Sequence, residues 1–151
     1  MEGNGTTGTI RRLLLAVVLL GMAGTAAELV LLEHYESTWQ LVPLATLSVG
    51  AALTLLVLLQ PTRGAVLALR GVLLAFLVVG GLGLWRHYAG NVEFELERHP
   101  ERAGLVLLWA ALRGATPALA PGTMIQIGLF GLIALFRHPV AASPAPPARG
   151  A

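Results

Sequence analysis

Four apolar runs, separated by short polar stretches, dominate the pattern of this chain. They cover about residues 13–32, 41–59, 66–88 and 117–136. Each run is close to the ~20 residues that a helix needs to cross the hydrocarbon core of a bilayer. The pattern therefore predicts an all-α fold, a bundle of four transmembrane helices within a membrane domain of residues 11–138.

The segments at the two ends of the chain differ from this pattern. Residues 1–10 are rich in Gly and Thr and predict a flexible start, and residues 139–151 are rich in Pro and Ala and predict a disordered tail. The first run follows Arg11-Arg12 and contains the small residues 23–27, which also suits a secretory signal peptide. Because the run continues to Leu32, we expect a retained first helix.

The polar region between the third and fourth runs contains two distinct patterns. Residues 92–97 alternate strictly between apolar residues and Glu, which is the period of a half-buried strand. Residues 103–112 are apolar but too few to span, and Arg102 and Arg113 flank them, which favours an interfacial helix. The loop is thus expected to carry a short extended segment and then an interfacial helix.

Composition supports the membrane interpretation and excludes several function classes. Hydrophobic residues make up 56% of the chain and charged residues 12%, against about a quarter charged in soluble domains. The absence of Cys excludes thiol catalysis and iron–sulfur ligation. A net charge of +2 gives no argument for nucleic acid. The lipid bilayer is the expected partner, with a second membrane protein or further copies of the chain as additional candidates.

The arginines predict the orientation. One face of the membrane would hold six arginines and the other four, and the richer face is the cytoplasmic one. We therefore expect cytoplasmic N- and C-termini in a bacterial inner membrane. The two sets are Arg11, Arg12, Arg63, Arg70, Arg137 and Arg149 inside, and Arg86, Arg98, Arg102 and Arg113 outside.

Small residues in the apolar runs predict where helices pack closely. In lipid there is no hydrophobic driving force for helices to associate. Helix contacts are therefore expected where small side chains let the backbones approach closely. The stripes are Gly21 and Thr25 in the first run, Thr46, Gly50 and Thr54 in the second, Gly80 and Gly83 in the third, and Gly128 and Gly131 in the fourth.

Two His-Tyr pairs at the outer ends of the first and third runs form the main candidate site. Neutral imidazole is a common metal ligand, so His34 and His87, with Glu93 and Glu95, form a candidate metal site. A divalent metal is one candidate cofactor, and haem held by the two histidines is another. The alternative is that His, Tyr and Trp occupy this level because they favour the membrane interface.

A second group of candidate ligand-binding residues comprises Glu28, Tyr35, Tyr88, Asn91 and Gln126. Glu28 is a carboxylate inside an apolar run, and such groups usually face the bundle interior. Helical rise puts it level with Gln126 and with hydroxyls of the second run, Thr46 and Ser48. We expect an inward-facing Glu28 in one polar layer, either a proton or cation relay or a polar clasp that fixes helix register.

Four stretches of the chain stand out together: residues 28–36 (ELVLLEHYE), Trp39-Gln40, residues 88–95 (YAGNVEFE) and residues 116–122 (TPALAPG). In this combination the chain resembles small four-helix bacterial membrane proteins that have no assigned activity. The similarity covers residues 11–139 and adds no activity.

No nucleophile elbow, phosphate loop or dinucleotide fingerprint occurs, and we predict no catalytic residues. The expected function is non-enzymatic, an outer Glu/His/Tyr-rich face that binds a cation, a small ligand or a protein partner. Two alternatives stay open. One is a metal- or haem-dependent membrane enzyme or electron carrier using His34 and His87, and the other is a small proton-coupled transporter using Glu28.

Overall fold

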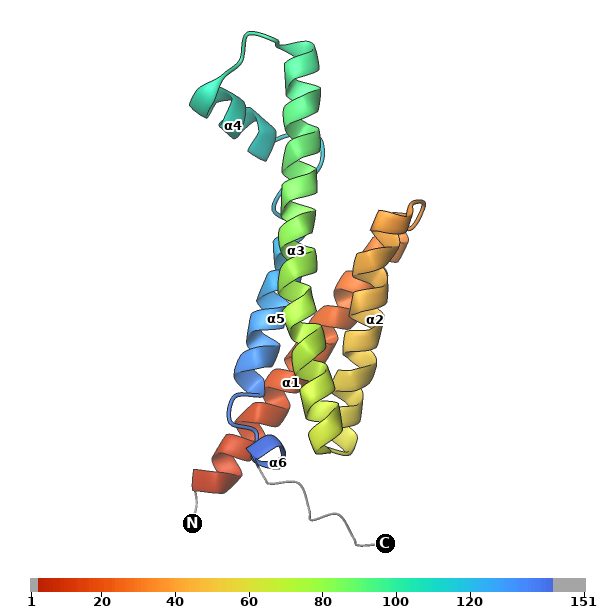
Figure 1. Ribbon diagram of the computed structural model, residues 1–151, viewed down its shortest axis with the longest axis vertical. Coiled ribbons are helices and arrows are strands. Elements are labelled where there is room, and N and C mark those ends of the chain that lie inside the picture. Colours follow the sequence, from red (N-terminus) through yellow and green to blue (C-terminus); the bar gives the residue numbers. More distant parts are fainter. Residues whose placement is uncertain (1–2, 143–151) are drawn as a thin grey trace, which may run out of the picture.

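The computed structural model of the protein describes residues 3–142 (Figure 1). All of its regular elements in this range are helices, and no strand occurs there. Three helices are long and form the body of the molecule, and three are shorter. The helices are α1 (Gly3–Leu31), α2 (Thr38–Leu59), α3 (Arg63–Arg98), α4 (Gly104–Leu112), α5 (Gly122–Ala134) and α6 (Pro139–Ala142).

Three of these helices, α1, α2 and α3, are long and apolar enough to cross a membrane. The all-α prediction is confirmed in the described residues, and the chain has the character of a membrane protein. The fourth apolar run forms a helix of only 13 residues, α5, about 20 Å long. Four helices of spanning length were expected, and the described residues contain three.

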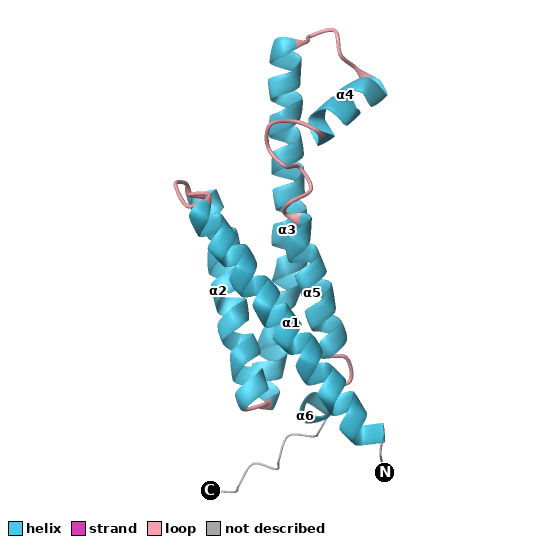
Figure 2. Ribbon diagram, turned by 180° about the vertical axis from the view of Figure 1, so that it is seen from behind, coloured by secondary structure: helices cyan, strands magenta, loops and turns pink. Residues whose placement is uncertain are grey.

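The long helices and α5 contact one another in a ring. Helix α2 packs against α1 and α3, and α5 packs against the same two helices from the other side. Helices α1 and α3 therefore lie across one diagonal, as Figure 2 shows with α5 and α2 on either side. Phe76 fills the centre with Met22 and Leu47, all fully buried, and it approaches α2 where Gly50 leaves room.

The closest helix contact joins α3 and α5, and glycines make it possible. A Cβ at Gly80 would lie 2.7 Å from Ile125 Cγ1, and one at Gly128 would lie 2.9 Å from the Leu73 carbonyl oxygen. Gly131 faces Leu73 in the same way, and Gly83 faces Pro121. The prediction of close packing at these stripes is confirmed.

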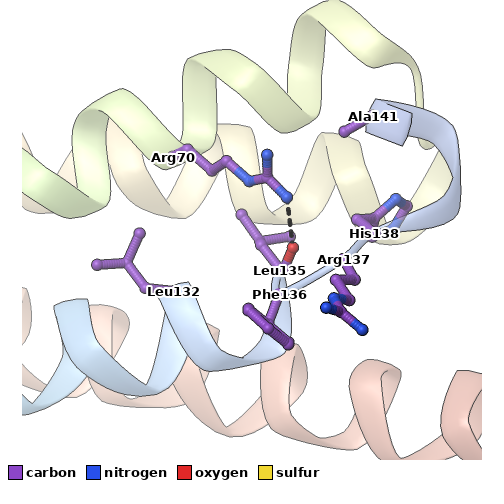
Figure 3. A pocket seen from close by; sticks show the side chains of 7 residues that line it. All are labelled: Arg70, Leu132, Leu135, Phe136, Arg137, His138 and Ala141. Carbon is purple, nitrogen blue, oxygen red and sulfur yellow. Dashed lines mark hydrogen bonds between the residues drawn. The ribbon is translucent and has the colours of Figure 1, made fainter. Parts of the chain in front are cut away.

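Hydrogen bonds fix the levels at which α5 runs beside α3. Near its start, the Pro117 carbonyl lies 3.2 Å from His87 Nδ1, and just after its end Arg70 donates to the Leu135 carbonyl at 2.6 Å (Figure 3). Arg70 and His87 are about 26 Å apart along α3. The chain from 117 to 135 therefore covers the same slab as residues 70–87, a thickness near the ~30 Å hydrocarbon core of a bilayer.

Helix α3 continues past this slab, and the expected extended segment is wrong. Residues 92–97 are the last two turns of α3. The like-charged neighbours Glu93 and Glu97 cost about 0.2–0.5 kcal/mol at i, i+4 spacing. Each backbone hydrogen bond gained by continuing the helix contributes about 1 kcal/mol net. The Arg98 guanidinium also lies 5.2 Å from the ring centroid of Phe94, one turn earlier.

The projecting part of the molecule, residues 88–116, is called the outer arm below. It consists of the end of α3, the returning helix α4 and the connection to α5, and in Figure 1 it extends well beyond the α1–α2 turn. Helix α4 coincides with the segment predicted to form an interfacial helix. It contacts α3 alone among the described helices.

The ends of the chain also differ from expectation. The Gly/Thr-rich start, predicted to be flexible, is helical from Gly3 onward because α1 extends past Arg11. Residues Pro139–Ala142, the first part of the predicted disordered tail, form the short helix α6. The remainder of that prediction, residues 143–151, lies outside the described residues.

Candidate functional site

The two histidines singled out by the sequence lie together at the outer end of the bundle. The ring centroids of His34 and His87 are 6.3 Å apart, with planes tilted by 56°. His34 follows α1, and His87 lies on α3, the helix across the diagonal. Both side chains are partly buried. The contact therefore links two helices that do not lie side by side.

Local backbone geometry holds His34 in place. Glu33 has a φ of 53°, in the left-handed region. The Glu33 amide donates to the Val30 carbonyl and the His34 amide to the Leu29 carbonyl, which together form a Schellman motif. Glycine usually occupies the position of Glu33, so this turn stores backbone strain. His34 is thus placed by a strained helix end.

The hydrogen bonds of Gln40 assign the tautomer of His34. Ser37 and Gln40 form a capping box at the start of α2, in which the Ser37 amide donates to Gln40 Oε1 at 2.8 Å. Gln40 Nε2 lies 3.5 Å from His34 Nδ1. Because the amide oxygen already accepts, the amide nitrogen must donate, and Nδ1 of neutral His34 accepts. Its proton is then on Nε2.

His87 takes the opposite tautomer. Its Nδ1 lies 3.2 Å from the Pro117 carbonyl oxygen, which can only accept. Neutral His87 therefore carries its proton on Nδ1 and has a lone pair on Nε2. Consequently, one ring of the pair offers a free donor and the other a free acceptor.

The two rings also interact through charge. Burial lowers the pKa of His34, and the neighbouring imidazole of His87 lowers that pKa further. A buried imidazole resists charging because it loses hydration, and two imidazolium rings repel. The environment of His34 therefore favours its neutral form.

Asn91, predicted to bind a ligand, is instead fully engaged within the chain. It is 2% exposed. Its Nδ2 donates to the carbonyls of Ala111 at 2.9 Å and Thr116 at 2.7 Å. Its Oδ1 accepts from the Thr116 amide and hydroxyl. An amide side chain offers two donors and about two acceptor positions, so Asn91 is a clasp that fixes the outer arm.

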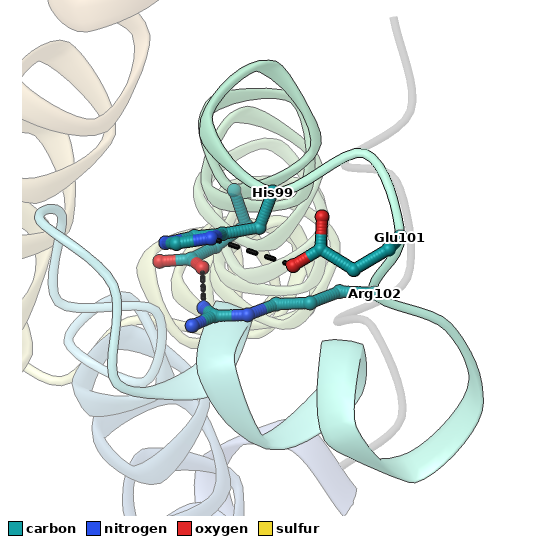
Figure 4. A network of polar contacts seen from close by, with 4 residues as sticks. His99, Glu101 and Arg102 are labelled. Carbon is teal, nitrogen blue, oxygen red and sulfur yellow. Dashed lines mark hydrogen bonds and ion pairs between the residues drawn. The ribbon is translucent and has the colours of Figure 1, made fainter.

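The four residues of the predicted metal site are not brought together. No group of three His or Glu side chains among residues 3–142 is arranged to hold a metal ion. Glu93 is exposed on α3. Glu95 pairs with Arg102, which precedes α4, beside a weaker contact of 3.6 Å between His99 and Glu101 (Figure 4). Only the histidine pair of this prediction forms a cluster.

Aromatic residues surround the histidine pair at the same level. Tyr35 is exposed just after α1, and Tyr88 is partly buried with its ring 6.4 Å from that of Trp85. The Arg86 guanidinium lies 5.0 Å from the Trp39 ring centroid, linking α3 to the start of α2. Such residues are typical of a membrane interface, and none points to a specific ligand.

The predicted polar layer is wrong. Glu28 and Gln126 are exposed rather than facing the interior. The hydroxyls of Thr46 and Ser48 donate to carbonyls of their own helix, those of Val42 and Leu44. Glu28 lies within one turn of the end of α1, where a carboxylate reaches the headgroup level without a partner in the bundle.

Sequence reasoning missed a second cluster at the opposite end of the bundle, beside the end of α5, which is called the inner end below. Arg11 Nε donates to the Ala134 carbonyl at 2.9 Å, and Arg70 donates to the Leu135 carbonyl. His138 follows in the same turn and is 7% exposed. The available signal was Arg70 inside an apolar run and a histidine directly after another run. From the sequence alone, Arg70 contributed only to the arginine count that predicts the orientation.

Comparisons with known proteins add no relationship. No protein-family model, curated protein or solved structure matches the chain. The interpretation of both ends of the molecule therefore rests on their own geometry.

Proposed function

We propose that this chain is a non-enzymatic membrane protein whose outer end responds to protons through the His34–His87 pair. It would lie in a bacterial inner membrane with cytoplasmic ends. The observation that carries the proposal is the contact between the two rings, whose centroids are 6.3 Å apart and which links two helices that do not lie side by side. Histidine is the side chain that ordinarily changes charge between pH 5 and 8.

Charge segregation supports the proposed orientation. Arg11 and Arg70 contact the end of α5, while His87 contacts the connection that precedes α5. The chain from 117 to 135 would then serve as a fourth crossing, shorter than the other three. Residues at the arginine-rich level would be cytoplasmic.

The proposed response follows from the tautomers. With both rings neutral, a water between them would accept from Nε2–H of His34 and donate to the Nε2 lone pair of His87. Protonation of both rings would create two adjacent cations. The α1–α2 turn would then separate from α3, breaking the contact between Arg86 and Trp39.

The direction of the pH dependence follows from the lowered pKa of His34. The contact between the neutral rings of His34 and His87 is fully formed above the ordinary histidine pKa of about 6.5. It weakens as the pH falls through the lowered pKa of His34. Glu33 and Glu36 flank His34 in its turn, and Arg86 flanks His87 on α3. These charged neighbours influence the pH at which the contact weakens. The change from attraction to repulsion between the rings is caused by the two histidines.

Nitrogen NMR of the imidazole rings would test this proposal. In wild-type protein in neutral nanodiscs, we expect His34 protonated on Nε2, His87 on Nδ1, and His34 titrating below about 6.5. His87→Ala should raise the pKa of His34, because the repelling ring is gone. His99→Ala, which removes an exposed histidine of the outer arm, should leave it unchanged. Identical His34 titrations in all three proteins would disprove the coupling.

A second candidate function is metal binding at the same pair. The bond from His87 Nδ1 to the Pro117 carbonyl is the kind of contact that orients a metal-ligating histidine. His34 would have to exchange its Nε2 proton for the metal, so affinity should fall with falling pH. Zn²⁺ titrated into the same NMR samples should perturb both rings together. Perturbation of neither ring would remove this candidate.

A further inference from the structure

The inner end of the molecule contains a cavity of about 390 Å³ beside the turn after α5. In Figure 3 the Arg70 side chain reaches from α3 toward this turn. The volume lies at the lower end of the ~300–1,000 Å³ usual for small-molecule sites. Its lining residues are Arg70, Leu132, Leu135, Phe136, Arg137, His138 and Ala141.

Two arginines neutralise the end of α5 beside this cavity. Arg70 donates to the Leu135 carbonyl at 2.6 Å, and Arg11 donates to the carbonyls of Ala134 at 2.9 Å and Phe136 at 3.3 Å. The last carbonyls of a helix carry partial negative charge. Because both guanidinium groups cover them, the cavity does not present a negative helix end to a ligand. The other N–H donors of Arg70 stay available.

His138 supplies an independent observation. It is 93% buried, and its Nδ1 has no hydrogen-bond partner among the described residues. Buried polar atoms are almost always paired, so an unpaired one calls for an explanation. Arg137 precedes it with a φ of 45°, a strained conformation that turns the chain and puts His138 into the cavity wall.

Charge at this end is of one sign. Five arginines of the described chain lie at the inner end, and every glutamate described lies at or beyond the outer ends of the long helices. The arginines are Arg11, Arg12, Arg63, Arg70 and Arg137. Coulombic attraction therefore favours an anion here, and little within the described chain competes for it.

We infer that this cavity binds a phosphate group, the chemistry shared by the headgroup of an anionic phospholipid and by free phosphate. Arg70 and Arg137 would supply charge, and His138 would donate one hydrogen bond from its unpaired nitrogen. Basic pockets at the cytoplasmic ends of membrane helices suit such headgroups. The apolar wall formed by Leu132, Leu135 and Phe136 gives an attached acyl chain a surface to follow.

The affinity of the inferred site for an anion should depend on pH. Burial lowers the pKa of His138, and the nearby Arg11 and Arg70 lower that pKa further. An anion opposite the ring would favour the protonated form and raise the pKa. Affinity for the anion should therefore increase as the pH falls through the histidine range. The groups that face the ring are Arg11 from α1, Arg70 from α3 and its neighbour Arg137, while α6 contributes no charge.

Binding can be measured on the full chain in a maltoside detergent, which carries no phosphate group. Phosphatidylglycerol and inorganic phosphate would be titrated separately, with bound lipid counted by native mass spectrometry and phosphate followed by ³¹P NMR. Retention of phosphatidylglycerol alone would identify a lipid headgroup site. Binding of both would identify a site for the phosphate group itself. Either result supports the inference, and binding of neither would overturn it.

Matched variants separate this site from general attraction to a basic surface. His138→Phe keeps the buried ring and removes the unpaired nitrogen, so the fold should be kept. It and Arg137→Gln should each weaken binding roughly tenfold to hundredfold, the size of one charge-assisted hydrogen bond. Arg12→Gln removes an exposed charge that does not line the cavity and should change affinity less than twofold. Equal losses in Arg12→Gln and Arg137→Gln would refute the site.

Discussion

Two helix ends in this molecule are built alike and left in different chemical states. At the outer end, Glu33 in the left-handed region precedes His34, and at the inner end Arg137 in the same region precedes His138. His34 has a partner ring and an amide, whereas Nδ1 of His138 has no partner in the described chain. The outer cluster is completed by its own residues. The inner one lacks a hydrogen-bonding group that a ligand would supply.

The surroundings of the two ends differ in the same way. In the outer arm, all four hydrogen-bonding positions of Asn91 are used within the chain. At the inner end, Arg11 and Arg70 satisfy backbone carbonyls, and no carboxylate of residues 3–142 is paired with either arginine. By the number of polar residues alone, the outer end would be the better candidate for a bound small molecule. The inner end is the better candidate once the hydrogen-bond partners of each polar group are considered.

Among the variants that test this difference between the two ends, substitution of Asn91 should have the largest effect on stability. Asn91→Leu would remove four hydrogen bonds and leave the Thr116 amide and carbonyl without their Asn91 partner, whereas the Ala111 carbonyl keeps the Gly114 amide. We expect the outer arm to lose about 3 kcal/mol of stability, because each hydrogen bond contributes about 0.5–1.5 kcal/mol net. Hydrogen exchange should show loss of protection across residues 104–116, with α1 and α2 unaffected.

A second variant disturbs the same contact while leaving the Asn91 side chain in place. A Cβ at Gly114 would lie 2.5 Å from Asn91 Cγ, so Gly114→Ala should loosen the same region. Glu97→Gln, on the exposed face of α3, is the matched control. Unchanged protection in both Asn91→Leu and Gly114→Ala would show that the clasp is not needed for the outer arm.

A smaller effect is expected at Arg70. Arg70→Met keeps the aliphatic stem and removes the bond to the Leu135 carbonyl, a loss of about 1.5–3 kcal/mol for a bond to a charged donor. The melting temperature in detergent should fall by several degrees. Arg63→Met, which removes an exposed charge at the start of α3, should leave it nearly unchanged. Equal melting temperatures would mean that Arg70 is only a solvated charge.

The smallest effect is expected at the strained outer turn, where Glu33 has a positive φ. Glu33→Gly should stabilise the outer turn by up to about 1 kcal/mol, because glycine adopts a positive φ without the Cβ clash. Local hydrogen exchange of the His34 amide is the measurement, with Glu36→Gly as the control. Faster exchange in Glu33→Gly would mean that the carboxylate, not the backbone, maintains the turn.

The sequence predicted those features that depend on hydropathy and side-chain size. Long apolar runs gave the helices, and Gly80 and Gly128 marked the close contact of α3 with α5 because only small residues allow it. His34 and His87 were expected at one level because both end outward-running helices. Their levels were predictable from helical rise, and their contact was not.

Other features depend on the rotation of a helix or on alternatives of similar free energy. Glu28 has apolar neighbours on several sides of α1, so the pattern did not reveal which face is buried, and the inward orientation was wrong. The alternation of residues 92–97 suits a strand, yet the same residues continue a helix at little cost. The roles of Asn91 and Arg70 depend on Thr116 and Leu135, partners 25 and 65 residues away in the chain.

The glycine contact between α3 and α5 has a consequence for biogenesis. Helix α5 is 13 residues long, so its hydrophobicity alone favours lateral transfer from the translocon into the bilayer only weakly. Leu73 and Ile125 meet glycines on the facing helix, a surface available only after α3 has entered the bilayer. We therefore expect α5 to be integrated last, by docking on its neighbour. A ribosome stalled before residue 117 should leave a stable three-helix intermediate in the membrane.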